Sequence, residues 1–196
     1  MKYQDLTTFT YPVRLAAYAH RGQLRKYDGL PYIKHPITVA DTVRSIGAGR
    51  DVITAALLHD VVEDTYMTLD NVERAFGRRV ADMVHWLTDD PRGDRNRMQH
   101  KIDLTERMQH APPWVKTIKL ADLIDNAESI LQHDPNFAKV FMAEKVYLMR
   151  SLTEGHPALY YRATQLVRNS GYKWLIHASQ WGAGLPDLIK ISKRRN

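Results

Sequence analysis

The chain contains no cysteine among its 196 residues. This absence excludes disulfides, thiolate zinc sites and cysteine nucleophiles. Any metal ion must therefore be held by histidine, carboxylate or water ligands. A chain without cysteine also fits a reducing compartment, and we expect a cytoplasmic protein.

Long apolar runs are missing as well. No stretch approaches the roughly 20 residues that a membrane helix needs, and the first residues, MKYQDLTTFTYP, lack the charged-then-apolar pattern of a signal peptide. We therefore expect no membrane partner. The sequence also lacks a glycine-rich phosphate loop, a Ser-His-Asp order and a dinucleotide fingerprint, so the enzyme classes that those motifs define are not indicated.

Acidic residues are fewer than basic ones: the chain has 22 Asp and Glu and 28 Lys and Arg, which gives a formal net charge of +6. A basic protein attracts phosphates, whether on nucleic acids or on phosphorylated small molecules. The aromatic residues do not alternate with basic ones, so no stacking strip for single strands is indicated. The charge alone leaves both kinds of ligand open, and a basic surface that serves only solubility is the alternative.

Apolar residues recur at helical spacing along most of the chain, and no strand-like alternation of useful length is present. Pro36 is suited to open a helix and Gly47 to end it, while Asp51 and Thr68 are expected N-caps. The tail beyond Gly171 has no clear pattern. The expected helices cover residues 13–20, 36–46, 52–62, 69–76, 80–87, 97–109, 113–130, 136–153 and 157–169. The pattern predicts an all-α fold with one domain over residues 1–196.

The segment Leu57-Leu58-His59-Asp60-Val61-Val62-Glu63-Asp64 places four ionisable residues in a very apolar helix, where burial is costly unless they are paired or metal-bound. On a continuous helix they fall within one arc of roughly 140°. His59 and Asp60 are then adjacent metal ligands, and Glu63 and Asp64 lie one turn further on, near metal-bound water. The alternative is a helix end that emerges into solvent.

Two further residues extend this candidate site. Asp122 interrupts an apolar helix and shares a face with Asn126, although such an aspartate often caps or bonds backbone. His35 precedes Pro36 at a helix start, where a surface histidine is the alternative. Two imidazoles and two carboxylates suit manganese, iron, cobalt or zinc better than calcium or magnesium. Such a metal activates water against a phosphoryl group, and Glu63 and Asp64 can orient that water and move protons.

Several motifs together resemble the hydrolase domain of RelA/SpoT homologues. They are AHRGQLRK (19–26), PYIKHP (31–36), AALLHDVVEDT (55–65), FG (76–77) and IKLAD (118–122). Their order and spacing match from about residue 14 to 126. At 196 residues the chain is similar to the stand-alone small alarmone hydrolases of this family. The resemblance implies a helical bundle of the HD phosphohydrolase type and assigns no role to residues beyond Asn126, including the helices expected over 136–196.

The resemblance implies removal of the 3′-pyrophosphate from guanosine tetra- and pentaphosphate, with Mn²⁺ as the usual metal. By position, the metal ligands would be His35, His59, Asp60 and Asp122. The residues that activate water would be Glu63 and Asp64. The substrate-binding residues would be Arg25, Lys26, Tyr32 and Asn126. His20 lies in the first motif but is not a ligand in the family, and we interpret it as structural.

The sequence departs from the family pattern beside the base pocket. Leu123 and Asp125 stand where Arg and His are usual, and Tyr27-Asp28 replaces a common Ser-Gly. These changes leave the metal and water-activating residues intact but bear on the choice of base. One alternative is therefore the same chemistry on an adenosine alarmone or on NADPH. An alternative of another class is a non-catalytic nucleotide-binding or nucleic-acid-binding protein.

Overall fold

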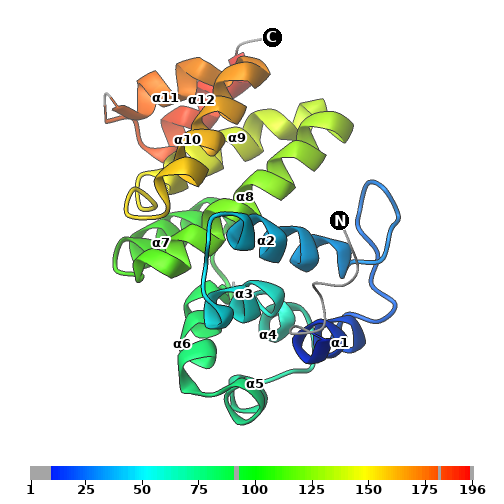
Figure 1. Ribbon diagram of the computed structural model, residues 1–196. Coiled ribbons are helices and arrows are strands. Elements are labelled where there is room, and N and C mark those ends of the chain that lie inside the picture. The colour runs from blue at the N-terminus through cyan, green and yellow to red at the C-terminus, as the bar shows by residue number, and fades with distance from the viewer. Residues whose placement is uncertain (1–9, 91–92, 181, 195–196) are drawn as a thin grey trace. The chain divides into compact units, whose positions relative to one another are not determined.

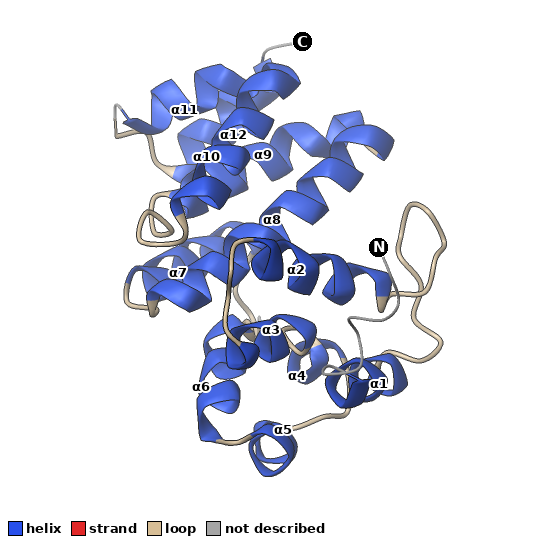
Figure 2. Ribbon diagram, in the orientation of Figure 1, coloured by secondary structure: helices blue, strands red, loops and turns tan. Residues whose placement is uncertain are grey.

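The computed structural model describes residues 10–90, 93–180 and 182–194, and the regular structure of these residues is helical (Figures 1 and 2). The described residues contain no strand beyond an isolated bridge between Leu24 and Pro31. None of the described helices is long and apolar enough to cross a membrane. The all-α prediction is confirmed.

The chain forms two compact units, one ending at Asp89 and the other beginning at Asp90. The expected single domain over residues 1–196 stays a prediction. The helices of the first unit are α1 (Thr10–Ala19), α2 (Lys34–Ser45), α3 (Arg50–Leu57), α4 (Val61–Asp64), α5 (Leu69–Phe76) and α6 (Arg78–Leu87).

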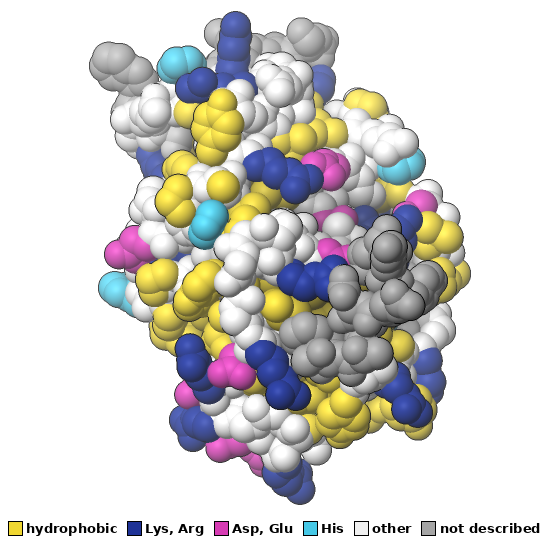
Figure 3. Space-filling model, in the orientation of Figure 1, with side chains coloured by type: hydrophobic (Ala, Val, Ile, Leu, Met, Phe, Trp, Pro, Cys, Tyr) yellow, Lys and Arg dark blue, Asp and Glu magenta, His cyan; other side chains and the backbone are white. Residues whose placement is uncertain are grey.

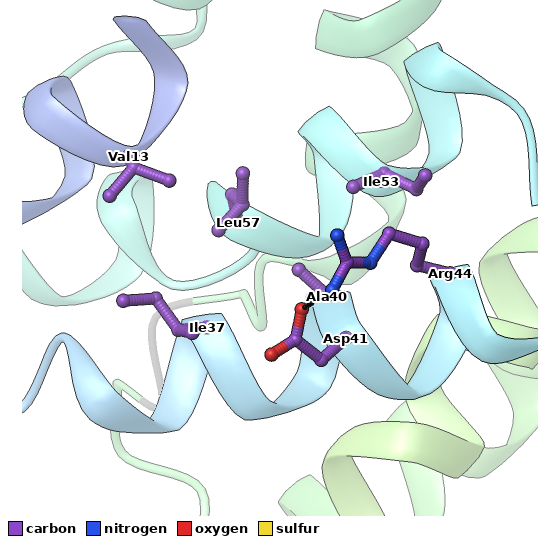
Figure 4. Close-up of a pocket in the computed structure, with 7 residues that line it drawn as sticks. All are labelled: Val13, Ile37, Ala40, Asp41, Arg44, Ile53 and Leu57. Carbon is purple, nitrogen blue, oxygen red and sulfur yellow. Dashed lines mark hydrogen bonds and ion pairs between the residues drawn. The ribbon is translucent and has the colours of Figure 1, made fainter. Parts of the chain in front are cut away.

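Helix α3 lies at the centre of the first unit, where it packs against α1, α2 and α6, while α5 packs on α6. Figure 4 shows the junction of α1, α2 and α3, with Val13, Ile37 and Leu57 facing one another and an Arg44–Asp41 ion pair beside them. The hollow at this junction measures about 10 Å³. It holds at most one water molecule, so it is no substrate pocket.

Two helix ends in the first unit follow from local sequence. Thr68 accepts from the backbone N–H of Asn71, and the Asn71 side chain accepts from the backbone of Thr68, which is the capping box of α5. Gly77 ends α5 with φ 86° and ψ 163°, a conformation that is open almost only to glycine. The predicted cap at Thr68 and the predicted stop at Gly77 are confirmed.

The predicted continuous helix over residues 52–62 is wrong. Helix α3 ends at Leu57, the chain turns through Leu58–Asp60, and α4 begins at Val61. The His59 ring supplies the reason, because its Nδ1 lies 2.8 Å from the carbonyl oxygen of Ala56, one of the last carbonyls of α3. A side chain that satisfies a terminal carbonyl favours a helix end. Asp51 is not the N-cap either, because α3 begins one residue earlier and its N-cap is Gly49.

The second unit contains the remaining helices. They are α7 (Arg97–Gln109), α8 (Pro113–His133), α9 (Pro135–Met149), α10 (Pro157–Val167), the π-helix η2 (Arg168–Tyr172), α11 (Lys173–Gln180) and α12 (Leu185–Arg194). Helix α9 contacts each of the other α-helices of this unit. Arg97 on α7 donates through Nε and a terminal nitrogen to the buried Glu144 of α9, at 2.6 and 2.8 Å. This paired geometry fastens α7 to α9.

Gly155 stands where the loop after α9 passes close to α8. A Cβ atom on this residue would lie 2.7 Å from Leu120 Cδ1 and 3.0 Å from the carbonyl oxygen of Leu152. Leu120 is fully buried, so its side chain has little room to move away. The close approach of this loop to α8 therefore depends on glycine.

We expect Gly155→Ala to lower the free energy of unfolding by about 1–3 kcal/mol, the usual cost of overpacking. Chemical denaturation monitored by circular dichroism measures this change. The matched control is Gly49→Ala, where an added Cβ meets nothing within 4 Å. A loss at position 155 no larger than that at position 49 would contradict the prediction.

Candidate metal centre

His59 occupies the turn between α3 and α4 and is fully buried. Its Nδ1 must carry a hydrogen, because the Ala56 carbonyl oxygen at 2.8 Å can only accept. In the neutral ring, Nε2 therefore presents a lone pair. A histidine with this tautomer is prepared to bind a metal ion through Nε2.

His35 lies in the first turn of α2 and is also buried. Its Nε2 lies 3.2 Å from Nε2 of His59, and Oδ2 of Asp60 lies 3.0 Å from His59 Nε2 and 3.6 Å from His35 Nε2. These three atoms form a candidate metal-binding cluster. His35 joins it from a distant part of the chain, 24 positions before His59. The structure thus brings together three of the four expected ligands.

The chemistry of this cluster fits a divalent transition metal. Ligand atoms about 2.1 Å from one ion, at the angles of octahedral or tetrahedral coordination, lie roughly 3.0–3.4 Å apart. Two of the observed separations, 3.0 and 3.2 Å, lie in this range, and the third, 3.6 Å between His35 Nε2 and Asp60 Oδ2, is slightly longer. Two imidazole nitrogens and a carboxylate oxygen repel one another unless a proton or a cation lies between them. The donor set therefore favours a cation such as manganese, iron, cobalt or zinc.

Tyr32 precedes α2 and contacts the cluster directly. Its hydroxyl donates a hydrogen bond of 2.6 Å to Oδ2 of Asp60. The sequence suggested Tyr32 only as a substrate-binding residue, and this contact was not foreseen. The hydroxyl fixes the orientation of the Asp60 carboxylate, because rotation of that group would break the bond.

Glu63 and Asp64 lie on α4, and both are accessible to solvent, although neighbouring residues partly enclose the Asp64 carboxyl group. Oε2 of Glu63 accepts a hydrogen bond of 2.9 Å from the backbone N–H of Asp89. Partial burial and the neighbouring Asp60 carboxylate raise the pKa of Asp64 above its usual value, although the nearby histidines oppose this shift. A carboxylate with a raised pKa is a stronger base.

Asp122 belongs to the second unit, in the middle of α8, and is 5% exposed. Its Oδ1 accepts a hydrogen bond from the Asn126 side chain at 2.5 Å, and its Oδ2 lies 3.3 Å from Nζ of Lys119. The predicted shared face of Asp122 and Asn126 is confirmed. Asn126 therefore orients the Asp122 carboxylate, which differs from the substrate-binding role that the resemblance implied for it.

Arg25 and Lys26 lie in the loop between α1 and α2. The loop is closed by backbone hydrogen bonds, from Tyr32 N to Gln23 O at 2.9 Å and from Arg25 N to Leu30 O at 2.8 Å. Nε of Arg25 lies 3.5 Å from Oδ2 of Asp28, and the Arg25 side chain is only 12% exposed. The exposed Lys26 donates to the hydroxyl of Tyr27.

Two residues of the first motif make contacts that the sequence did not predict. Gln23 donates through Nε2 to the backbone carbonyl of Asp64 at 2.8 Å, and its Oε1 lies 2.7 Å from Nδ1 of His20. The resemblance of the motif to the RelA/SpoT family was the available signal, but no periodicity connects positions 23 and 64. These residues link the end of α1 to the metal-binding segment.

The second unit contains a cavity of about 280 Å³ lined by residues of α9, α10 and α11. Arg150 contributes the charged group of its lining, and no histidine or carboxylate lines it. It offers no metal-binding set. On the face drawn in Figure 3, Lys and Arg side chains lie apart, with Asp and Glu among them.

In this helical chain, a His-Asp pair at a helix break lies next to a histidine from a preceding helix. This arrangement is typical of the HD class of metal-dependent phosphohydrolases. The sequence model of the HD domain matches residues 13–159, which is most of the chain. The protein belongs to the HD domain family.

Within this family the chain is similar to alarmone hydrolases. It is 42% identical over 126 residues to guanosine-3′,5′-bis(diphosphate) 3′-pyrophosphohydrolase MESH1 of Mus musculus, a match that covers 61% of this chain and 68% of that protein. A solved metazoan orthologue of SpoT that hydrolyses ppGpp superposes with a TM-score of 0.77 at 29% identity, covering 85% of this chain and 97% of the other. The protein lmo0812 of Listeria monocytogenes EGD-e gives a TM-score of 0.60 at 26% identity, covering 78% and 99%.

Lys145 lies on α9, in the second unit. Its Nζ lies 4.9 Å from the centre of the Phe141 ring. Burial lowers the pKa of Lys145 to about 8, with Asp122 opposing the shift and Lys119 and Lys101 adding to it. The ordinary pKa of 10.5 applies when the chain is unfolded. The protonated amine therefore costs stability below pH 8, and this cost disappears as the pH rises from 8 to 10.5.

We expect Lys145→Met to be more stable than the wild type at pH 7, because it keeps the apolar stem and removes the buried charge. The difference in free energy of unfolding between variant and wild type should be smaller at pH 9.5, because the cost of the protonated Lys145 has partly disappeared there. Urea denaturation at the two pH values measures it, and the control is Lys173→Met on the exposed start of α11. A stability gain at position 145 that does not change with pH would refute the prediction.

Proposed function

We propose that the chain is a metal-dependent guanosine 3′,5′-bis(diphosphate) 3′-pyrophosphohydrolase. The observation that carries this proposal is the convergence of His35, His59 and Asp60 within coordination distance of one ion, next to the carboxylates of α4. The names of the relatives support the substrate, since MESH1 from mouse and from human is described by this activity. We propose a nucleotide small molecule, and no nucleic acid, as its partner.

We propose Mn²⁺ as the metal and Asp122 as its fourth ligand. Two imidazole nitrogens and two carboxylate oxygens form a donor set that suits Mn²⁺. The buried position of Asp122 supports its role, because a carboxylate at 5% exposure in an apolar helix needs compensation. Asn126 and Lys119 supply part of it. A metal ion would supply the rest.

The proposed reaction is hydrolysis at the 3′-linked phosphorus. His35, His59 and Asp60 would hold a divalent cation, which would lower the pKa of a water molecule and polarise the phosphoryl oxygen. Glu63, anchored to the backbone of Asp89, orients the water, and Asp64 takes its proton. The water oxygen bonds to the phosphorus, and the bond to the ribose 3′-oxygen breaks. That oxygen takes up a proton from solvent and leaves as a hydroxyl, while the proton that Asp64 accepted returns to solvent. Guanosine tetraphosphate then yields GDP and pyrophosphate.

We propose that Arg25, Lys26, Tyr32 and Asn126 border the substrate. The exposed ammonium of Lys26 suits a phosphate, and an arginine plane suits a base. Tyr32 and Asn126 hold the carboxylates of Asp60 and Asp122 in the structure, so we assign them first to orienting those groups and second to the substrate.

We expect the wild type with Mn²⁺ to release GDP and pyrophosphate from guanosine tetraphosphate. Asp60→Ala should lose both metal binding and turnover, because it removes a ligand. Glu63→Gln should keep the metal but lose about 100- to 10,000-fold in kcat, the usual contribution of a positioned acid–base group. Phosphate-release and metal analyses measure the two effects.

The control for these variants is Asp82→Asn on α6, which removes an exposed carboxylate paired with Arg78. It should leave turnover unchanged. An inactive wild type with Mn²⁺ present, or unchanged turnover in Asp60→Ala, would overturn the proposed function.

A second candidate is the same reaction on an adenine nucleotide, such as an adenosine alarmone or NADPH. The contact between Arg25 and Asp28 favours it, because Asp28 replaces a common glycine and lies against the residue assigned to the base. Leu123, which replaces a common arginine, is 1% exposed and offers no polar group to a base.

We expect Asp28→Gly to raise kcat/KM for guanosine tetraphosphate relative to its adenosine counterpart, because it releases Arg25 for the base. Parallel assays of both substrates with wild type and variant measure the ratio. The exposed Asp70→Gly on α5 serves as the control. An unchanged ratio would show that the contact with Asp28 does not govern base choice.

A further inference from the structure

His20 is the buried histidine of the first unit that the proposed reaction does not use. It follows α1 directly and is 2% exposed. Its Nε2 is buried and has no hydrogen-bond partner among the residues that the structure describes. Leaving a buried polar atom unpaired costs about 1–3 kcal/mol, so its presence calls for an explanation.

The hydrogen bonds of His20 run toward the metal-binding segment. Gln23 must present its amide NH₂ to the carbonyl of Asp64, because a carbonyl can only accept. Its Oε1 therefore faces His20, and Nδ1 of His20 must donate to it at 2.7 Å. One side of His20 is thereby tied to the backbone of α4.

The contacts of His20 form two branches: the hydrogen bonds through Gln23 to Asp64 are the first, and the packing of the His20 ring on Tyr32 is the second. The centre of the His20 ring lies 4.8 Å from that of Tyr32, whose ring lies 5.7 Å from His35. The His35 ring in turn lies 5.1 Å from His59. Four rings therefore follow one another from His20 into the cluster, and the Tyr32 hydroxyl leaves this row to bind Asp60. Any rotation of Tyr32 toward His20 is blocked by the His20 ring.

We propose that His20 is a positioning residue for the metal centre. Its ring holds Tyr32 in place, and the Tyr32 hydroxyl in turn sets the direction of the Asp60 carboxylate. Its hydrogen bond to Gln23 also fixes the position of α4, because Gln23 donates to the carbonyl of Asp64. The proposal rests on the proposed function only in taking His35, His59 and Asp60 as metal ligands. A histidine that merely filled space would need neither branch.

The two branches can be separated by substitution. His20→Phe keeps a ring against Tyr32 and removes the Nδ1–H donor. His20→Asn keeps a donor toward Gln23 and removes the ring. Tyr32→Phe removes only the hydroxyl that binds Asp60. Loss of such support around a metal ligand costs about 10–100-fold in metal affinity.

The test is the affinity of the full chain for Mn²⁺, followed by the electron paramagnetic resonance signal of unbound Mn²⁺ in a titration. We expect the Kd to rise about 10–100-fold in Tyr32→Phe and in His20→Asn, and by less in His20→Phe, because the ring remains. The control is His156→Asn, a half-buried histidine of the second unit that should leave the affinity unchanged.

Steady-state kinetics give the second measurement. A displaced Asp60 should lower kcat for guanosine tetraphosphate while KM changes little, whereas a disturbed binding loop would raise KM. Circular dichroism tests whether each variant folds. If His20→Asn does not fold, Tyr32→Phe and His20→Phe decide the matter, since each changes only one or two polar atoms.

The outcomes distinguish the two proposals. Folded Tyr32→Phe and His20→Asn with wild-type affinity for Mn²⁺ would overturn the positioning role and leave the proposed function intact. A weakened affinity for Mn²⁺ in these variants would support the positioning role. If the wild type then binds Mn²⁺ but hydrolyses no alarmone, that result counts against the proposed function alone. A wild type that binds no Mn²⁺ would overturn both.

Discussion

The metal centre depends on the turn that separates α3 from α4. In a continuous helix the side chains of His59 and Asp60 would diverge by about 100°. The turn instead brings His59 Nε2 and Asp60 Oδ2 to 3.0 Å, and the hydrogen bond from His59 Nδ1 to the Ala56 carbonyl holds the ring there. His35 then completes a group of three donors around one point. The hydroxyl of Tyr32 and the carboxylates of α4 are arranged around that group.

Burial of charge organises each unit in a different way. In the first unit, two imidazole nitrogens and a carboxylate oxygen converge, and one cation can bind to all three. In the second unit the buried Glu144 is instead paired with a basic side chain, that of Arg97. The distinction is chemical, because a paired acid supports packing whereas converging lone pairs need an ion.

The sequence predicted most elements where a local signal exists. The N-cap at Thr68 and the helix over residues 97–109 depend on neighbours in the chain, and both appear as predicted. The break at Leu58–Asp60 was missed because apolar residues continue on both sides of it, so the helical periodicity gives no sign of an end. The link from His20 through Gln23 to Asp64 was missed because it spans more than 40 positions, and no spacing rule reaches that far.

By itself, the sequence determined the helical class, the ligand types and, through its motifs, the family and its chemistry. Ionisable residues within apolar segments are costly to bury, so their presence alone marked His59, Asp60 and Asp122 as candidates. Only the tertiary structure decided how His35, His59 and Asp60 meet, and that Tyr32 and Asn126 first hold carboxylates. The reason is physical: a coordination site is defined by distances of about 3 Å between side chains, and only the folded backbone sets these.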